Sequence, residues 1–194
     1  MLPIRLESGA SLFIVLQVPA ASSPRTRKKN WPLLKKTQTL EGPWTVRFDS
    51  TFGGPSEPVD FRLLQDWSLH SDSSIRYYSG TARYTKTFRM GTPEKGKAIY
   101  LQLGKVANLA EVFVNGISCG VAWTAPYRVE ITKALRPGTN SLRIDVTNTW
   151  ANRMIGDHRL AEEKRITKTI SPYRLEGKPL LEAGLIGPVE VVEQ

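Results

Sequence analysis

The segment from Ile99 to Trp150 constrains the fold of this chain more than any other. Apolar residues at positions 110, 112 and 114 alternate with the residues between them and lead into Asn115-Gly116. This residue pair tolerates the positive φ angles that a two-residue hairpin turn requires. The chain then turns back through residues 117–123, so the pattern predicts a β-hairpin.

Two further alternating stretches follow the hairpin. In the first, the apolar residues Tyr127, Val129 and Ile131 are separated by Arg128 and Glu130. In the second, Leu142, Ile144 and Val146 alternate with the polar residues Arg143, Asp145 and Thr147. Each stretch therefore has one apolar and one polar face, which indicates half-buried antiparallel sheet.

The flanking regions give weaker signals. Trp44 to Phe48 is predicted as the first strand of the domain, and Val189 to Val192 as the strand that closes the sheet. Gly80 suggests a bulge within the run from Tyr77 to Phe88. Residues 151–183 show no lasting periodicity, and such a long connection in a compact β domain is typically functional or disordered.

Two short helical segments are expected. Thr132 to Leu135 is predicted as one helical turn with Thr132 as N-cap, ended by Pro137-Gly138. Leu160 to Arg165 is predicted as a short helix within the long connection.

A spaced set of turn residues in the central segment carries a family resemblance. It comprises the V-N-G turn, Gly120, Pro126-Tyr127, Ile131-Thr132 and the P-G-x-N sequence from Pro137 to Asn140. This set resembles the sugar-binding-type β-sandwich of family 2 glycoside hydrolases. The resemblance implies an all-β fold, an antiparallel β-sandwich of the jelly-roll, galactose-binding-domain-like type.

The flanks add a second resemblance, to the C-terminal region of family 106 α-L-rhamnosidases. The similar segments are Leu40 to Pro55, Tyr77 to Phe88, Asn148 to Asp157 and Gly184 to Val191. The resemblance implies a large, secreted or periplasmic sugar hydrolase, of which this chain would be one end.

Three regions are expected along the chain. Residues 1–19 are predicted as the terminal strand pair of a preceding domain, because Leu6 to Gln17 resembles that pair; a signal peptide with Leu12 to Val18 as its apolar core is the alternative. Residues 20–37 are predicted as a basic linker, and residues 38–194 as the β-sandwich.

The positive charge of the chain is concentrated in the predicted linker. The 194 residues carry a formal charge of +9, and six cations without an intervening acid lie at Arg25, Arg27, Lys28, Lys29, Lys35 and Lys36. Nucleic-acid binding is the alternative to a solvated linker, but Trp31 is the only aromatic residue in this run, and single-strand binders use several. We therefore expect no nucleic-acid partner, and no apolar run approaches the ~20 residues of a membrane helix.

Catalytic signals are weak. The two histidines lack partners at metal-ligand spacing, so no metal site is predicted, and the single cysteine, Cys119, is expected to be a small buried residue. A glycosidase needs two facing carboxylates, and the sequence leaves open a pair among Asp66, Asp157, Glu162, Glu163 and Glu182. In the resembled family the catalytic acids lie in the preceding domain, so no catalytic residue is predicted. No cofactor is expected either; a structural calcium on Asp49 and Asp157 is the alternative.

Carbohydrate binding has two candidate loops. Sugars stack on aromatic rings and bond to planar polar side chains. The candidates are Trp123 and Tyr127 in one loop and Trp150, Asn152, Arg153 and Asp157 in the other. The alternative is that the aromatics are core and the polar residues brace a loop. We expect Trp123 to be exposed and Tyr127 to lie in the core.

The leading functional prediction is a non-catalytic module of an α-L-rhamnosidase-like glycoside hydrolase. Its partners would be the catalytic domain, which it braces, and carbohydrate. A free-standing lectin-like domain is the first alternative, and a polyanion binder with steep salt dependence is the second.

Overall fold

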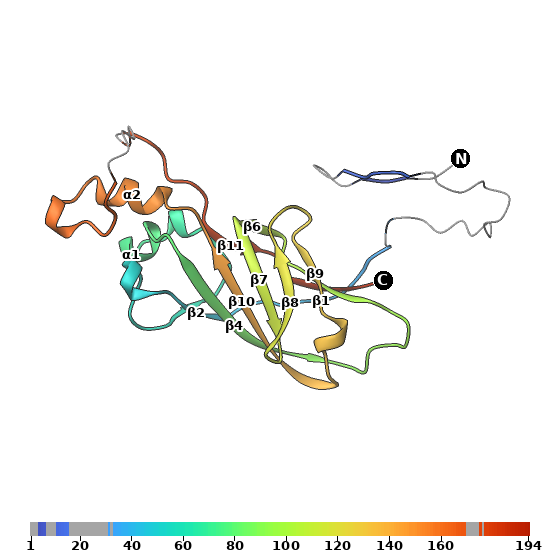
Figure 1. The fold of residues 1–194 in the computed structure, drawn as a ribbon. Helices are drawn as coiled ribbons and strands as arrows, with labels where there is room; N and C mark the ends of the chain where they lie inside the picture. The colour runs from blue at the N-terminus through green and yellow to red at the C-terminus, as the bar shows by residue number, and fades with distance from the viewer. Residues whose placement is uncertain (1–3, 7–10, 16–30, 32, 170–174, 176) are drawn as a thin grey trace.

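The computed structural model describes residues 4–6, 11–15, 31, 33–169, 175 and 177–194. Its body is an antiparallel β-sandwich (Figure 1), as predicted. One sheet has the strand order β1 (Lys35–Thr39), β12 (Glu190–Glu193), β5 (Ile99–Gln102) and β9 (Arg128–Glu130). The larger sheet has the order β3 (Val59–Phe61), β2 (Trp44–Arg47), β4 (Thr81–Met90), β10 (Gly138–Thr147), β7 (Leu109–Val114) and β8 (Ile117–Ala122).

Shorter elements complete the domain. Strand β11 (Gly184–Gly187) pairs with β6 (Lys105–Ala107) as a separate two-stranded sheet. The helices are α1 (Ser73–Arg76) and α2 (Ala151–Asp157), and the 3₁₀ turns are η2 (Ser50–Phe52), η3 (Trp67–Leu69), η4 (Thr132–Ala134) and η5 (Glu162–Lys164). None of the described helices is long and apolar enough to cross a membrane.

The predicted hairpin is confirmed as β7 and β8. Asn115 and Gly116 form its turn with φ angles of 52° and 80°. The Asn115 side chain also donates to the Ala134 carbonyl and to Asn140 Oδ1, at 2.9 and 2.7 Å, and accepts from the Ser141 amide at 3.0 Å. The turn residue therefore ties the hairpin to the start of β10.

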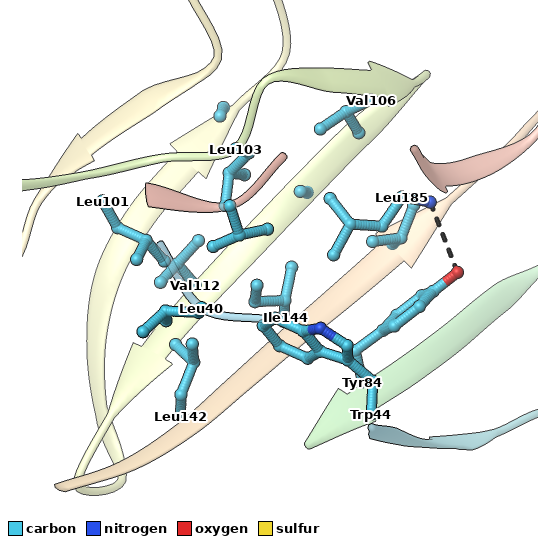
Figure 2. Close-up of a cluster of buried hydrophobic side chains, with 14 of the residues drawn as sticks. Leu40, Trp44, Tyr84, Leu101, Leu103, Val106, Val112, Leu142, Ile144 and Leu185 are labelled. Carbon is cyan, nitrogen blue, oxygen red and sulfur yellow. Dashed lines mark hydrogen bonds between the residues drawn. The ribbon is translucent and has the colours of Figure 1, made fainter. Parts of the chain in front are cut away.

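The alternating residues of these strands meet in the core between the sheets. Figure 2 shows apolar side chains from both sheets packed around Ile144, with Trp44 and Tyr84 on one side and Leu101 on the other. The Tyr84 hydroxyl accepts from the Trp67 indole nitrogen at 2.6 Å and from the Leu185 amide at 3.3 Å, the bond dashed in Figure 2. Burial raises the pKa of Tyr84 far above its usual value.

The first strand of the sandwich was not predicted. Strand β1 begins at Lys35, so Lys35 and Lys36 belong to a strand and the predicted boundary of the linker at residue 37 is wrong. Lys36 lies opposite Val192 and forms an ion pair with Glu190 at 3.1 Å. Because β1 is an edge strand with largely exposed side chains, its sequence lacks the apolar alternation that marks half-buried strands.

Three local predictions differ from the structure. The N-cap of η4 is Ile131, because the Thr132 hydroxyl accepts from the Ile99 amide at 2.8 Å instead of capping the turn. Gly80 precedes β4 and forms no bulge within it; its amide donates to Asn148 Oδ1 at 2.9 Å. The expected helix at 160–165 is only the turn η5.

Helix α2 lies where no periodic pattern was found. It is short, has no side-chain cap and contains a glycine, so local propensity does not identify it. Its buried residues fix it to the sandwich, as described below.

The N-terminal predictions are largely outside the described residues. Residues 4–6 and 11–15 are not assigned to strands, and the remainder of the predicted strand pair at 1–19 is not described. Most of the predicted linker, residues 20–30 and 32, is also outside the described residues.

Candidate carbohydrate-contact site

Trp123 follows the last residue of β8 and projects into solvent. Its exposed fraction is 72%, which confirms the predicted exposure. Ala122 pairs with Ala110, so Trp123 and Leu109 leave the hairpin at the same end. Leu109 and Val121 are also exposed, at 37% and 49%. Trp123 therefore belongs to a small apolar surface that the sequence pattern did not reveal.

Tyr127 lies just before β9 and behaves differently. It is half-buried and packs against the core, in agreement with the prediction that it belongs to the apolar face of its strand. Its carbonyl accepts from the Leu103 amide at 2.8 Å. Of the two aromatic residues in this loop, Trp123 is thus the one with an open ring.

Trp150 is the exposed aromatic of the second loop. Its side chain is 49% exposed and meets Phe52 edge to face, with ring centroids 5.6 Å apart and an interplanar angle of 81°. Phe52, in η2, is itself 36% exposed. The pairing of these rings was not predicted, because nothing in the sequence indicates that η2 lies beside the start of α2.

The polar residues of this loop point inward. Asn152 donates to the Leu181 carbonyl at 2.7 Å and accepts from the Leu181 amide at 2.8 Å. The Arg153 amide donates to the Ser79 hydroxyl at 3.0 Å, and its guanidinium donates to the Gly53 carbonyl at 3.3 Å. Both side chains are buried. Their hydrogen bonds join α2 to Gly53, which precedes it in the chain, and to Leu181, which follows it.

Asp157 completes this brace. It is 2% exposed and lies 3.6 Å from Arg153 across one turn of α2. Its other oxygen accepts from the amides of Ile166 and Thr167, at 3.0 and 2.6 Å, and from the Thr167 hydroxyl at 2.7 Å. The same carboxylate thus compensates a buried cation and holds the segment after η5, and the predicted role of Asn152, Arg153 and Asp157 in binding stays a prediction.

The remaining acidic candidates are engaged in structural contacts or exposed. Asp66 caps η3 and accepts from the Ala183 amide at 2.9 Å. Glu182 pairs with Lys105 at 2.6 Å, while Glu162 and Glu163 are exposed in the first turn of η5. Asp66 and Glu182 thus have structural partners, Glu162 and Glu163 are exposed, and none of the four lines the hollow described below.

His70 and the candidate metal ligand Asp49 are also engaged in contacts within the fold. His70 stacks on Phe61 with centroids 5.6 Å apart, and its Nδ1 accepts from the Asp72 amide at 3.0 Å. The Asp49 carboxylate caps η2 through Thr51, whose bonds lower the Asp49 pKa. Within the described ranges, no three His, Cys, Asp or Glu side chains gather into a metal-binding group.

Cys119 in β8 is half-buried against the core. Burial raises the pKa of its thiol, so the thiolate that reacts or binds metal is disfavoured. The side chain acts as a small apolar residue of the hairpin.

Comparison with known proteins identifies the family. Residues 67–174 match the model of the glycosyl hydrolase 2 galactose-binding domain-like family. The chain belongs to that family. The match covers the larger part of the sandwich, including α2 and the loop that Asp157 holds.

Similar proteins are sugar hydrolases. A putative β-glucuronidase of Formosa agariphila is 41% identical over 123 residues, which is 62% of this chain and 10% of that protein. A β-glucuronidase of the same organism is 29% identical over 92 residues, 46% of this chain and 9% of that protein. The structure of a rhamnosidase from Novosphingobium sp. PP1Y superposes with a TM-score of 0.78 at 41% identity, covering 84% of this chain and 16% of that chain.

These findings confirm the resemblance to the rhamnosidase sandwich and to the galactose-binding-type domain of family 2. The chain is a galactose-binding-like module of glycoside hydrolase-related proteins, and it spans about a tenth of the length of the curated relatives it matches. In such relatives the module is one part of a larger enzyme.

Proposed function

We propose that this module braces the catalytic domain of a glycoside hydrolase and contacts carbohydrate, without performing chemistry itself. The observation that carries the carbohydrate contact is the open ring of Trp123 at the end of β8. Tryptophan presents a large apolar face to the C–H groups of a sugar ring while its N–H remains available to a hydroxyl. Two observations support the bracing role. The chain covers only 16% of the similar rhamnosidase, so the module there is part of a larger protein, and the exposed apolar residues Leu109 and Val121 lie at the same end of the hairpin as Trp123.

The candidate binding residues divide into two groups under this proposal. Trp123 and Trp150 are exposed enough to meet a sugar ring. Tyr127 and the buried set Asn152, Arg153 and Asp157 position the loops that carry the tryptophans. We propose no cofactor, because the Asp49 and Asp157 carboxylates are each engaged by threonine.

Replacing Trp123 with alanine tests the carbohydrate contact. We expect loss of binding to uncharged rhamnose-containing oligosaccharides, with a change in unfolding free energy below about 0.5 kcal/mol, as for other exposed positions. Isothermal titration calorimetry and thermal unfolding of the same samples measure both quantities.

Two control variants separate binding from folding. Leu69→Ala removes another exposed apolar side chain, 81% exposed, and should change neither quantity. Tyr127→Ala removes a ring packed on the core and should cost about 3 kcal/mol of stability. A Trp123→Ala protein that is strongly destabilised, or that binds as well as the parent chain, would contradict the proposed contact.

A free-standing lectin-like domain is the second candidate. Micromolar affinity of the isolated chain for uncharged soluble oligosaccharides, unchanged when a catalytic domain is added, would favour it over a bracing module, whose sugar contacts are completed by that domain. The apolar surface formed by Leu109, Val121 and Trp123 favours bracing, because exposed apolar patches mark interaction sites.

A further inference from the structure

The outer face of the six-stranded sheet contains a hollow of about 430 Å³ that is separate from both tryptophan loops. Its volume lies in the range of small-molecule sites, about 300 to 1,000 Å³. Hydroxyl side chains and two cations dominate the lining, whose full set is Thr45, Thr85, Lys86, Thr87, Phe113, Gly116, Ser141, Leu142 and Arg143.

Strand register explains how these residues meet. Arg143 of β10 lies between Phe113 of β7 and Thr85 of β4, and Thr85 lies opposite Thr45 of β2. One row of outward side chains therefore crosses four strands. The neighbouring outward pair, Ser141 and Thr87, forms the next row.

Arg143 is held by an aromatic ring and by a carboxylate that it shares with a second arginine. Its guanidinium lies 3.6 Å from the centroid of the Phe113 ring. The nearby Asp145 is occupied by Arg83, which donates to both carboxylate oxygens at 3.0 and 3.2 Å, while Arg143 Nε is 3.5 Å from one of them. Two guanidinium groups thus share the single carboxylate of Asp145, and the three residues together keep a net charge of +1 beside the hollow.

The second cation of the lining, Lys86, lies on β4 between Thr85 and Thr87 and opposite the buried Leu142, so its side chain is directed to the other face of the sheet. The Lys86 ammonium group lies 5.3 Å from the centroid of the Trp44 ring and donates to the Pro43 carbonyl at 2.9 Å. No acidic residue lines the hollow; Asp60 lies at the edge of the sheet and accepts from the Thr45 hydroxyl at 2.9 Å. The positive charge that faces the hollow therefore comes from Arg143, and with no acid in the lining it favours an anion.

The hydroxyl groups supply the neutral part of the site. The Thr85 hydroxyl donates to the Thr45 carbonyl at 3.2 Å, which leaves its oxygen as an acceptor. Among the described residues, no hydrogen bond joins the hydroxyl of Thr87 or Ser141 to the protein, so each can donate and accept. Because Arg143 covers the Phe113 ring, that ring offers no stacking platform to a nucleobase.

We propose that this hollow binds a saccharide ring that carries an oxyanion, a uronate carboxylate or a sulfate ester. The oxyanion lies on the Arg143 guanidinium, whose planar fork matches such groups. The ring hydroxyls bond to the threonine and serine hydroxyls of β4 and β10. This binding is independent of Trp123 and Trp150, so it stands or falls separately from the proposed function.

The test is calorimetric titration of the full 194-residue chain with four probes. Tri-galacturonate and galactose 6-sulfate represent the two oxyanions, the methyl ester of tri-galacturonate keeps the rings but removes the charge, and inorganic sulfate has the charge without a ring. We expect at least one charged saccharide to bind about tenfold more tightly than the uncharged ester and inorganic sulfate. The charged probe that binds identifies the oxyanion.

Variants assign the binding to the hollow. Arg143→Gln should weaken it about tenfold, and Thr87→Val should weaken it severalfold with no change of charge. Arg47→Gln is the matched control, because Arg47 is an exposed cation of the same face that lies opposite Arg83 and outside the hollow; it should have less than about a twofold effect.

Four results would overturn the proposal. These are no binding of either charged saccharide, equal binding of the methyl ester, equal binding of inorganic sulfate, and unchanged affinity in both Arg143→Gln and Thr87→Val. Thermal unfolding of each variant checks that the sheet is intact, and Thr87→Val decides the matter if Arg143→Gln does not fold.

Discussion

Replacing Asp157 with alanine is expected to lower the free energy of unfolding by about 3 to 5 kcal/mol, the range for removing one partner of a buried ion pair. The Arg153 guanidinium would remain buried without its carboxylate, and three hydrogen bonds to Ile166 and Thr167 would be lost. Urea unfolding monitored by tryptophan fluorescence measures the change.

Glu162→Ala is the control for this prediction. Glu162 is an exposed acid of the same loop, so its removal should change stability by less than about 0.5 kcal/mol. An Asp157→Ala protein as stable as the parent chain would show that the carboxylate does not brace the loop, and would return Asp157 to the candidates for direct ligand contact.

Gly184→Ala is expected to destabilise the domain by about 2 to 5 kcal/mol, the combined range of backbone strain and overpacking. Gly184 has a φ of +98°, and a Cβ built on it would lie within 2.4 to 2.7 Å of three atoms of the Trp67 indole. Trp67 is fully buried and its indole N–H donates a hydrogen bond to the Tyr84 hydroxyl, so the ring cannot shift without losing packing or this bond. Differential scanning calorimetry reports the loss.

Gly138→Ala separates strain from overpacking. Gly138 also begins a strand and has a φ of +90°, but a Cβ there would meet nothing within 4 Å. It should therefore cost only the strain, about 1 to 3 kcal/mol. Equal losses in the two variants would contradict the packing of Gly184 against Trp67.

The alternation of apolar residues was sufficient to predict the central strands. Val112 and Ile144 are fully buried, as their patterns require, and Asn115-Gly116 forms the predicted turn. These signals are local: each depends on side-chain spacing within one strand or on the φ preference of two adjacent residues.

The features that sequence reasoning missed depend on contacts between distant segments. Strand β1 is stabilised by its ladder with β12, and α2 by Asn152 and Arg153 reaching Leu181 and Gly53. Tertiary contacts of this kind override weak local propensity.

The candidate site illustrates the same division. The composition of the loop identified both Trp123 and Tyr127 as candidates. Only the position of Tyr127 in the apolar alternation of its strand indicated that its ring is half-buried while the ring of Trp123 is exposed. The hollow beside Arg143 needs the register of β2, β4, β7 and β10, which no single strand encodes. The alternation of residues predicts the polar face of each strand. The register between strands, which the structure provides, determines which polar residues are neighbours.

The most direct test of the account is whether the isolated chain hydrolyses glycosides. Incubation with aryl α-L-rhamnoside, aryl β-D-glucuronide and aryl β-D-galactoside is expected to release no aryl alcohol above the buffer rate, because a glycosidase needs two carboxylates flanking one bond. Among the described candidates, Asp66 and Asp157 are engaged in hydrogen bonds that hold loops of the fold. Turnover of any of these substrates that disappears in a folded Glu162→Gln or Glu182→Gln variant would contradict the assignment of this chain as a non-catalytic module.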